Sequence, residues 1–356
     1  RFTLAPGLTW AHYGADGGEL IAAAMVNGVP HPPGYPLYTL LLRFWLHLSA
    51  AVLPLREPIW HGNLLSALFA ACSVGLTVLV VEYLLRDKRF SWGWAYIAGL
   101  AWAISPLSWS QAVITEVYAL HILLFVLLGW VLLVHNGEPW LLGPVVALGV
   151  AHHLTFVLLL PATLYLCWVS GPHEDSPSRR SRLLAIGLGL LAGMILYLRI
   201  PLAAAGGGST PPPVNWGYAD NWAGFWWLVS GDAYRAYLFG ASADVLLARL
   251  AAWSNVLTTQ LTFVGLGLGL WGLSYWDEHW PQRRNFGLLW VVPVALYSLI
   301  YYTRDSDIYL LPVVWMLVLW AVTGLWAATR WLQSKLSLRW TVPVTIVGVL
   351  ILLIAL

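Results

Sequence analysis

The chain has 356 residues, of which 60% are hydrophobic and only 10% are charged. This composition excludes a soluble globular domain, because such domains carry about a quarter charged residues. The formal net charge is +2 and no basic stripe is present, which excludes a nucleic-acid partner. The apolar runs reach the roughly 20 residues that a helix needs to cross a membrane, and they lack the alternation of barrel strands. We therefore predict an all-α, polytopic transmembrane protein that forms one domain over residues 1–356.

Residues 1–60 are predicted to form an external loop. Glycines and prolines interrupt residues 1–36, with room for a short helix at residues 20–27. Residues 37–53 are apolar but carry Arg43 and His47 in their middle, so this helix either spans the membrane or lies in its interface. We favour the interface, which leaves the opening acidic loop on the outer face.

The rest of the chain is predicted to alternate between spans and short connections. Basic residues at 86–89, 179–182, 283–284 and 330–339 then all face the cytoplasm, as the positive-inside rule requires. Residues 203–250 form a second external loop. Nearly all basic residues are arginine, which suggests a GC-rich bacterial genome, so we expect a multi-pass protein of a bacterial cell membrane. The expected spans, about ten, are residues 61–85, 91–104, 117–134, 140–150, 154–169, 183–202, 252–276, 286–302, 308–328 and 341–356.

This topology gathers ionisable residues from distant segments on the outer side. Any one of these acids could simply be a solvated or helix-capping carboxylate. Asp16 and Glu19 stand out, because the two glycines between them let the backbone approach a ligand, and such a carboxylate can accept a proton from a hydroxyl nucleophile. His31 precedes two prolines, which restrict it to extended geometry, and both a catalytic or binding role and a loop-fixing hydrogen bond are open. The outer residues are Asp16, Glu19, His31, Glu116, Asp220, Asp232, Asp305 and Asp307.

Short motifs spread over nearly the whole chain form a recognisable set. They are Thr3-Leu-Ala-Pro-Gly-Leu-Thr-Trp10, Asp16-Gly-Gly-Glu19, His31-Pro-Pro-Gly-Tyr-Pro-Leu-Tyr38, Asn63-Leu-Leu-Ser-Ala67, Thr115-Glu-Val-Tyr118, Gly149-Val-Ala-His-His153, Asn215-Trp216 and Asp305-Ser-Asp-Ile-Tyr309. This set resembles glycosyltransferase family 117, earlier described as domain-of-unknown-function family 2723. That family is similar to the GT-C superfamily of polytopic glycosyltransferases. Protein O-mannosyltransferases likewise pair an acidic motif with His-Pro-Pro in the first external loop.

The resemblance implies a membrane glycosyltransferase. The donor would be a polyprenyl-phosphate sugar, which we expect to carry a hexose such as mannose, and the acceptor a hydroxyl of a protein or glycan on the outer face. Asp16 would be the catalytic carboxylate, with Glu19 as its neighbour. The resemblance also implies a first transmembrane helix before Arg1, and the sequence as given starts after it. The expected substrate-binding residues are His31, Pro32, Pro33, Tyr35, Glu116, Asp305 and Asp307.

A departing phosphate needs a cation more than it needs an acid. Arg56, Arg199 and Arg304 lie at outer ends of predicted spans and are the candidate donor-phosphate residues, although snorkelling anchors are the alternative. We interpret His121 and the pair His152-His153 as packing residues and predict no metal cofactor, while a divalent-metal requirement stays open. A tryptophan group could stack on a sugar or belong to an interfacial belt, and it consists of Trp216, Trp222, Trp226 and Trp227.

Two other classes of protein share this hydropathy. A transporter or lipid flippase would show internal repeats and ionisable residues near mid-membrane, and no convincing repeat is present. A non-catalytic accessory subunit of a larger membrane complex would carry the transferase motifs unused. The partners expected from the favoured interpretation are the polyprenyl-phosphate sugar, the acceptor, membrane lipids and other subunits of a membrane complex.

Overall fold

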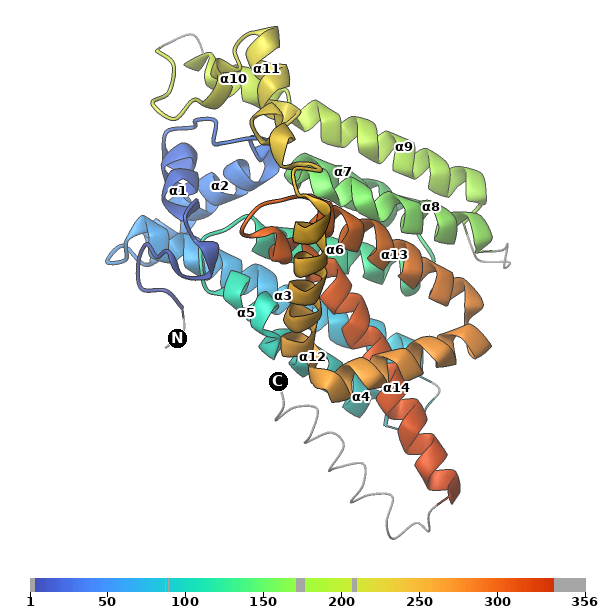
Figure 1. Cartoon of the computed structure of the whole chain (residues 1–356). Coiled ribbons are helices and arrows are strands. Elements are labelled where there is room, and N and C mark those ends of the chain that lie inside the picture. Colours follow the sequence, from blue (N-terminus) through green and yellow to red (C-terminus); the bar gives the residue numbers. More distant parts are fainter. Residues whose placement is uncertain (1–3, 87, 89, 171–176, 207–209, 336–356) are drawn as a thin grey trace.

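The computed structural model describes residues 4–86, 88, 90–170, 177–206 and 210–335, and these form helices without a strand (Figure 1). The all-α prediction is therefore confirmed. The helices of the first half are η1 (Ala11–Tyr13), α1 (Gly17–Met25), α2 (Pro36–Val52), α3 (Pro58–Leu85), α4 (Ser91–Ile104), α5 (Pro106–Ala112), α6 (Tyr118–Leu133), α7 (Pro139–His152), η2 (Leu154–Leu159) and α8 (Leu160–Val169). Those of the second half are α9 (Arg179–Leu196), α10 (Arg199–Ala204), η4 (Trp216–Tyr218), α11 (Trp222–Val229), η5 (Asp232–Tyr237), α12 (Ala243–His279), α13 (Pro281–Ile300), η6 (Ser306–Leu310) and α14 (Leu311–Lys335).

Four stretches of the described residues are long and apolar enough to cross a membrane. Several predicted spans form helices that are shorter than the roughly 20 residues a crossing requires, among them α6 and α7. A membrane protein is therefore supported, whereas the number of ten spans stays a prediction. The expected last span, residues 341–356, lies outside the described residues. The four qualifying stretches are Pro58–Leu85, Arg179–Ala204, Ala243–His279 and Ser306–Lys335.

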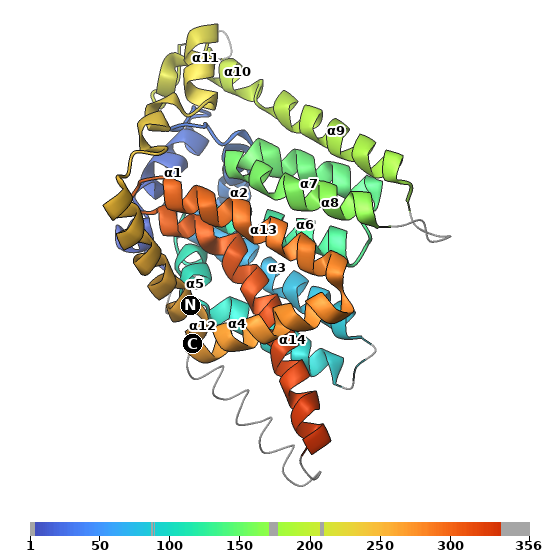
Figure 2. The same cartoon turned by 45° about the vertical axis from the view of Figure 1, so that its right-hand side comes forward.

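The helix α14 forms the centre of the bundle. Its most apolar window is 89% buried, whereas the other three candidate spans bury at most 39% of theirs. Both views show α14 running obliquely between the remaining helices (Figures 1 and 2). The indole of Trp315 on α14 is fully buried and donates a hydrogen bond to Thr77 of α3 at 3.0 Å, which pairs these two polar groups inside the apolar core.

The segment before α3 folds as two helices joined by the proline-rich turn. Pro36 begins α2, where its missing N–H costs no hydrogen bond. One face of α2 is buried through residues such as Leu42 and Leu46, while Phe44 and Leu48 are exposed. The helix predicted at residues 37–53 is thus present with one buried face, and its place in the membrane interface stays a prediction.

Two connections differ from the prediction. The sequence predicts a short external turn at residues 105–116, but these residues contain the helix α5, which begins at Pro106. The side chain of Gln260 on α12 accepts hydrogen bonds from the Ser105 hydroxyl and the Leu107 N–H, both at 2.8 Å, and so holds the start of α5 in place. Residues 203–250 also contain more helix than the predicted loop, because α11 and η5 lie within them.

The longest helix, α12, packs on α14 through two glycines. A Cβ atom at Gly272 would collide with the carbonyl oxygen of Trp320, and one at Gly324 would collide with that of Leu268. The two backbones therefore touch directly. Small residues permit such close approach between membrane helices, whose association depends on van der Waals packing.

Replacing Gly272 by alanine should destabilise the protein, because the new methyl group forces α12 away from α14. We expect a loss of ~1–3 kcal/mol, measured as a lower melting temperature in detergent. Gly267→Ala is the matched control, since it lies on the same helix and a Cβ there meets nothing within 4 Å. Alanine at that control position should be neutral or stabilising through its helix propensity. Equal melting temperatures for the two variants would contradict the close packing.

Candidate active site

The acidic pair lies at the beginning of α1. Asp16 is the N-cap of this helix and Glu19 lies in its first turn, where the helix dipole favours negative charge. Gly17 permits a close approach, because a Cβ there would lie 2.8 Å from the carbonyl oxygen of Thr115. The glycine between the acids therefore serves packing of α1 against the 113–117 segment. The carboxylate of Asp16 is left half exposed.

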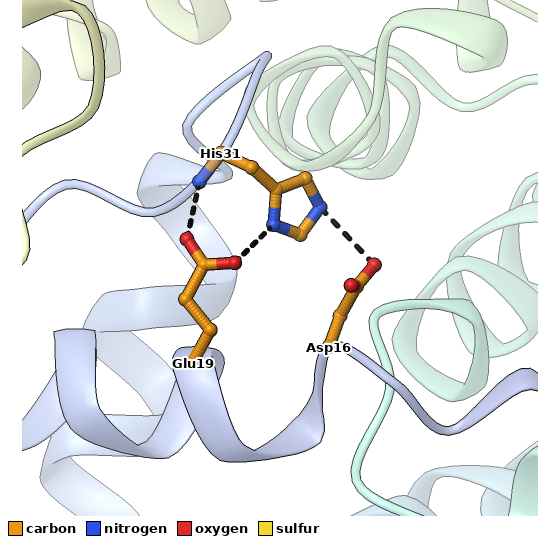
Figure 3. Close-up of side chains that lie close together, drawn as sticks. All are labelled: Asp16, Glu19 and His31. Carbon is orange, nitrogen blue, oxygen red and sulfur yellow. Dashed lines mark hydrogen bonds and ion pairs between the residues drawn. The ribbon is translucent and has the colours of Figure 1, made fainter. Parts of the chain in front are cut away.

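The imidazole of His31 bridges the two carboxylates (Figure 3). Its Nδ1 lies 3.0 Å from Oε2 of Glu19, and its Nε2 lies 3.4 Å from Oδ2 of Asp16. The backbone N–H of His31 also donates to Oε1 of Glu19 at 2.8 Å. Glu19 thus fixes both the loop and the ring, and the ring presents its second nitrogen to Asp16. The loop-fixing hydrogen bond considered for His31 is therefore present, and its catalytic or binding role stays a prediction.

The charges of the bridge change the acidity of its members. Burial alone would lower the pKa of His31, but the hydrogen bond that its ring donates to Glu19 and the charges of Asp16 and Glu19 raise that pKa above its ordinary value. Burial raises the pKa of Asp16, the charge of His31 opposes this rise, and the charges of Glu19 and Asp305 add to it. Asp16 is therefore a stronger base than an exposed aspartate, and His31 favours the imidazolium form.

Glu116 contacts the backbone of Asp16. Its side chain is buried, and its Oε1 accepts a hydrogen bond from the backbone N–H of Asp16 at 3.3 Å. Burial raises the pKa of Glu116 well above its ordinary value, and the charge of Asp16 raises it further. Glu116 thus holds the backbone that carries Asp16. The structure brings together four of the predicted residues, Asp16, Glu19, His31 and Glu116.

A cavity of about 320 Å³ opens beside the bridge, and we name it the aromatic cavity. The predicted residues Pro32, Pro33 and Tyr35 form part of its wall, and the ring of Tyr35 lies 5.2 Å from that of His31. Four further tyrosines line the remaining wall, next to aliphatic and small polar residues. Faces of aromatic rings suit the apolar face of a sugar. Further lining residues include His153, Tyr234, Arg235, Tyr297, Tyr301 and Tyr309.

A second cavity, of about 780 Å³, lies along α12, and we name it the α12 cavity. The predicted residues Arg304 and Asp307 line it, together with Tyr13 from the first loop. Asp305 lies between the lining residues Arg304 and Ser306, and its charge adds to burial in raising the pKa of both Tyr13 and Asp16. The 303–307 segment therefore connects the α12 cavity with the acidic group.

The other predicted cations have different surroundings. The guanidinium of Arg56 lies over the ring of Trp60 at 5.1 Å, as expected for an interfacial anchor. Arg199 donates to Oδ1 of Asn27 at 3.0 Å. Neither lines the aromatic or the α12 cavity. Of the predicted tryptophans, Trp216 reaches the bridge, with its ring 6.4 Å from that of His31, and Trp222 and Trp226 pack on each other.

The histidines of the hairpin between α7 and α8 contact neighbouring backbone, and their assignment as packing residues stays a prediction. His152 contacts the carbonyl oxygen of Val117 through Nε2 at 2.9 Å, and Nδ1 of His153 accepts the N–H of Thr155 at 3.2 Å. Both rings are buried near that of His121. They fix the end of α7 next to the 113–117 segment and so support Glu116 indirectly.

Sequence reasoning missed Tyr234 of η5. This residue lines the aromatic cavity, and burial together with the charges of Asp16 and Glu19 raises the pKa of its phenol to about 12. The signal in the sequence is the cluster of two tyrosines and an arginine at residues 234–237, which a membrane belt explains equally well. Tyr309 was also missed, although it ends one of the quoted motifs and lies within 3.5 Å of the Tyr118 hydroxyl.

One group in the described residues has ligand atoms close enough for a metal ion. These atoms, one each from Asp16, Glu19 and His31, lie within 4.8 Å of one another. Two carboxylates and an imidazole are ligands that divalent transition metals accept. In the observed arrangement both ring nitrogens already face carboxylates, so the bridge is complete as a set of hydrogen bonds and ion pairs.

Comparison with known proteins bears on the segment that carries this site. A family described as the protein O-mannosyl-transferase TMEM260 N-terminal domain matches residues 16–176. The protein O-mannosyl-transferase TMEM260 of Mus musculus is 27% identical in an alignment 311 residues long, which covers 82% of this chain and 42% of that protein. The protein O-mannosyl-transferase tmem260 of Dictyostelium discoideum is 25% identical in an alignment 287 residues long, which covers 73% of this chain and 33% of that protein. No solved structure gave a significant match.

The chain spans less than half the length of these curated relatives. Both organisms are eukaryotes, so these relatives do not support the bacterial origin expected from the arginine usage, which stays a prediction. The number 117 for the family also stays a prediction. The matched segment begins at Asp16 and includes Glu19, His31 and Glu116. The chain is therefore a membrane protein similar to the TMEM260 protein O-mannosyl-transferases, and the resemblance to protein O-mannosyltransferases that its motifs predicted is confirmed.

Proposed function

We propose that this chain transfers a hexose, most simply mannose, from a polyprenyl phosphate to a hydroxyl of a protein or glycan. The observation that carries this proposal is the carboxylate of Asp16, which is half exposed, raised in pKa and held between His31 and Glu116. Two cavities flank the group that contains it. The names of the relatives support a transferase of this kind.

The reaction is a displacement at the anomeric carbon of the donor. The acceptor oxygen forms a bond to this carbon while the bond to the phosphate oxygen breaks, and its electron pair leaves with the phosphate. Asp16 accepts the proton of the acceptor hydroxyl as the new bond forms. His31 orients the carboxylate through Nε2 and balances its charge, and Glu19 holds His31 in place. Attack from the face opposite the phosphate inverts the anomeric configuration.

The departing phosphate needs a cation, and Arg304 is the predicted arginine that lines a cavity beside the acidic group. The α12 cavity also contains apolar residues, including Val256, which suit the first isoprene units of the donor. The donor would then occupy the α12 cavity, with its sugar directed toward Asp16. The acceptor would approach through the aromatic cavity.

The site would lie on the outer face of the membrane. The basic residues Arg86 and Lys88 follow α3, whereas the beginning of this helix packs near Gly17. The positive-inside rule assigns the basic end to the cytoplasm and hence the acidic end to the outer side. A multi-pass protein of a cell membrane, with its acidic first loop outside, is the localisation we propose.

Replacing Asp16 by asparagine should lower sugar transfer at least 100-fold, because the base is lost while the shape is kept. Transfer of radiolabelled sugar from a panel of polyprenyl-phosphate sugars by the purified protein measures this. Asp220→Asn is the matched control, since Asp220 is an exposed carboxylate of the same outer side and lies outside the site. Undiminished turnover by Asp16→Asn would show that Asp16 is not the base. If the parent protein transferred no sugar from any donor, a non-catalytic accessory subunit would be favoured.

The rate of transfer should depend on pH with two limbs. It rises as Asp16 loses its proton, at a pH above the ordinary aspartate value of 3.8. It falls on the alkaline side as His31 loses its proton. Because the pKa of His31 is raised above 6.5, the stabilising imidazolium is fully present below pH 6.5 and is lost as the pH rises above that value. In His31→Gln the alkaline limb should disappear and the acid limb should move to higher pH, since the imidazolium no longer lowers the pKa of Asp16. An unchanged alkaline limb would contradict the role of His31.

The assignment of the donor phosphate can be tested by comparing two arginines. Arg304→Gln should raise the KM for the donor about tenfold or more, because a charge-assisted hydrogen bond to phosphate is lost. Arg56→Gln tests the competing assignment, since Arg56 stacks on Trp60 away from both cavities. Donor KM in a series of prenyl phosphates is the measurement. An effect in Arg56→Gln and none in Arg304→Gln would reverse the assignment.

A further inference from the structure

A small polar cavity lies at the opposite end of α3 from the acidic bridge. Its volume is about 210 Å³. The beginning of α3 packs near Gly17, where Ile59 would lie 3.5 Å from an added Cβ atom. The 28 residues of α3 span about 42 Å, so the cavity lies on the other side of a membrane that α3 crosses. The lining residues are Tyr83, Leu84, Arg86, Lys88, Trp280 and Arg283.

Three cations converge on this cavity, and none of them has an anionic partner among the described residues. In the part of the chain that the structure describes, no hydrogen bond or ion pair joins the side chains of Arg86, Lys88 or Arg283 to an acceptor. The neighbouring Arg284 differs, because it pairs with Asp277. Within the described residues, the three cations that face the cavity therefore keep N–H donors for a ligand.

Aromatic rings hold these cations in place. The guanidinium of Arg86 lies 4.5 Å from the ring centre of Tyr83, and that of Arg283 lies 4.9 Å from that of Trp280. The ammonium of Lys88 lies 5.6 Å from the ring of Trp326. Cation–π contacts fix the orientation of a cation but leave its edge N–H groups unpaired. Each cation therefore packs on a ring and has donors available for a ligand.

The cations also repel one another. Burial lowers the pKa of Arg283, and the charge of Arg86 lowers it further. Like charges that share a confined site raise the free energy of the folded protein unless an anion lies between them. An anion with several acceptor oxygens would satisfy the donors and remove the repulsion at once.

We propose that Arg86, Lys88 and Arg283 form a binding site for a phosphate-bearing anion, distinct from the proposed donor site. A phosphate group suits the polar wall, the volume and the planar guanidinium groups. A second cavity of about 310 Å³ adjoins it, shares Lys88, and is lined by Trp94 and Trp326 together with polar residues. Tryptophan rings of this kind lie at the level of lipid head groups. A phospholipid head group and a soluble phosphate are the two sources of this chemistry.

Native mass spectrometry of the purified full chain in detergent tests the site. The protein is titrated with phosphatidylglycerol and, separately, with phosphatidylcholine, and inorganic phosphate is titrated by calorimetry. The variant Arg86→Gln/Arg283→Gln should bind the anion at least tenfold more weakly, whereas Arg86→Lys/Arg283→Lys should retain part of the affinity. Arg179→Gln is the matched control, because Arg179 also stacks on a ring, that of Trp168, but lines none of these cavities.

Each outcome decides the proposal or its source. Binding of phosphatidylglycerol over phosphatidylcholine, lost in the glutamine variant and kept in the control, supports a site for anionic lipid. Binding of inorganic phosphate with the same mutational pattern and no preference among lipids supports a soluble ligand. Equal binding by the parent protein and a glutamine variant with an unchanged melting temperature overturns the site. Absence of binding by the parent protein to all probes also overturns it.

Discussion

The bridge from Glu19 through His31 to Asp16 is the interaction on which the candidate site depends. Glu19 accepts hydrogen bonds from both the backbone N–H and the ring of His31, so it ties the proline-rich turn to the first turn of α1. The remaining ring nitrogen then faces Asp16. If Glu19 were neutral, both the position of the turn and the charge of the imidazole would lose their support. A binding loop and a base are thus made rigid by the same three side chains.

The environment of this bridge is formed by segments that lie far from it in the sequence. Glu116 reaches Asp16 from the segment before α6, and the charge of Asp305 arrives from the segment after α13. Both segments are ends of helices that pack on the central α14. A membrane bundle has apolar lateral surfaces, so polar chemistry collects where helices end.

The sequence was sufficient to predict features of the site that depend on neighbouring residues, but not those that depend on contacts between distant segments. The short spacing between Asp16 and Glu19, and the prolines after His31, were sufficient to predict a rigid acidic loop. Spacing could not show that α5 forms within residues 105–116, because Gln260 of a remote helix holds its beginning in place. Nor could it show that Arg56 stacks on Trp60, since an arginine at a helix end suits an anchor and a ligand equally. The aromatic cavity draws on residues from four separate segments, which no periodicity relates.

The two ends of α3 differ in how their charges are balanced. At the acidic end, the carboxylates of Asp16 and Glu19 both face an imidazole of the same chain, so each has an internal partner when no ligand is bound. At the basic end, cations rest on aromatic rings and repel one another, so a bound anion would neutralise them. A group whose charges have internal partners suits turnover, because substrate and product can leave it at little electrostatic cost. An unbalanced group suits retention, because loss of the anion restores the repulsion.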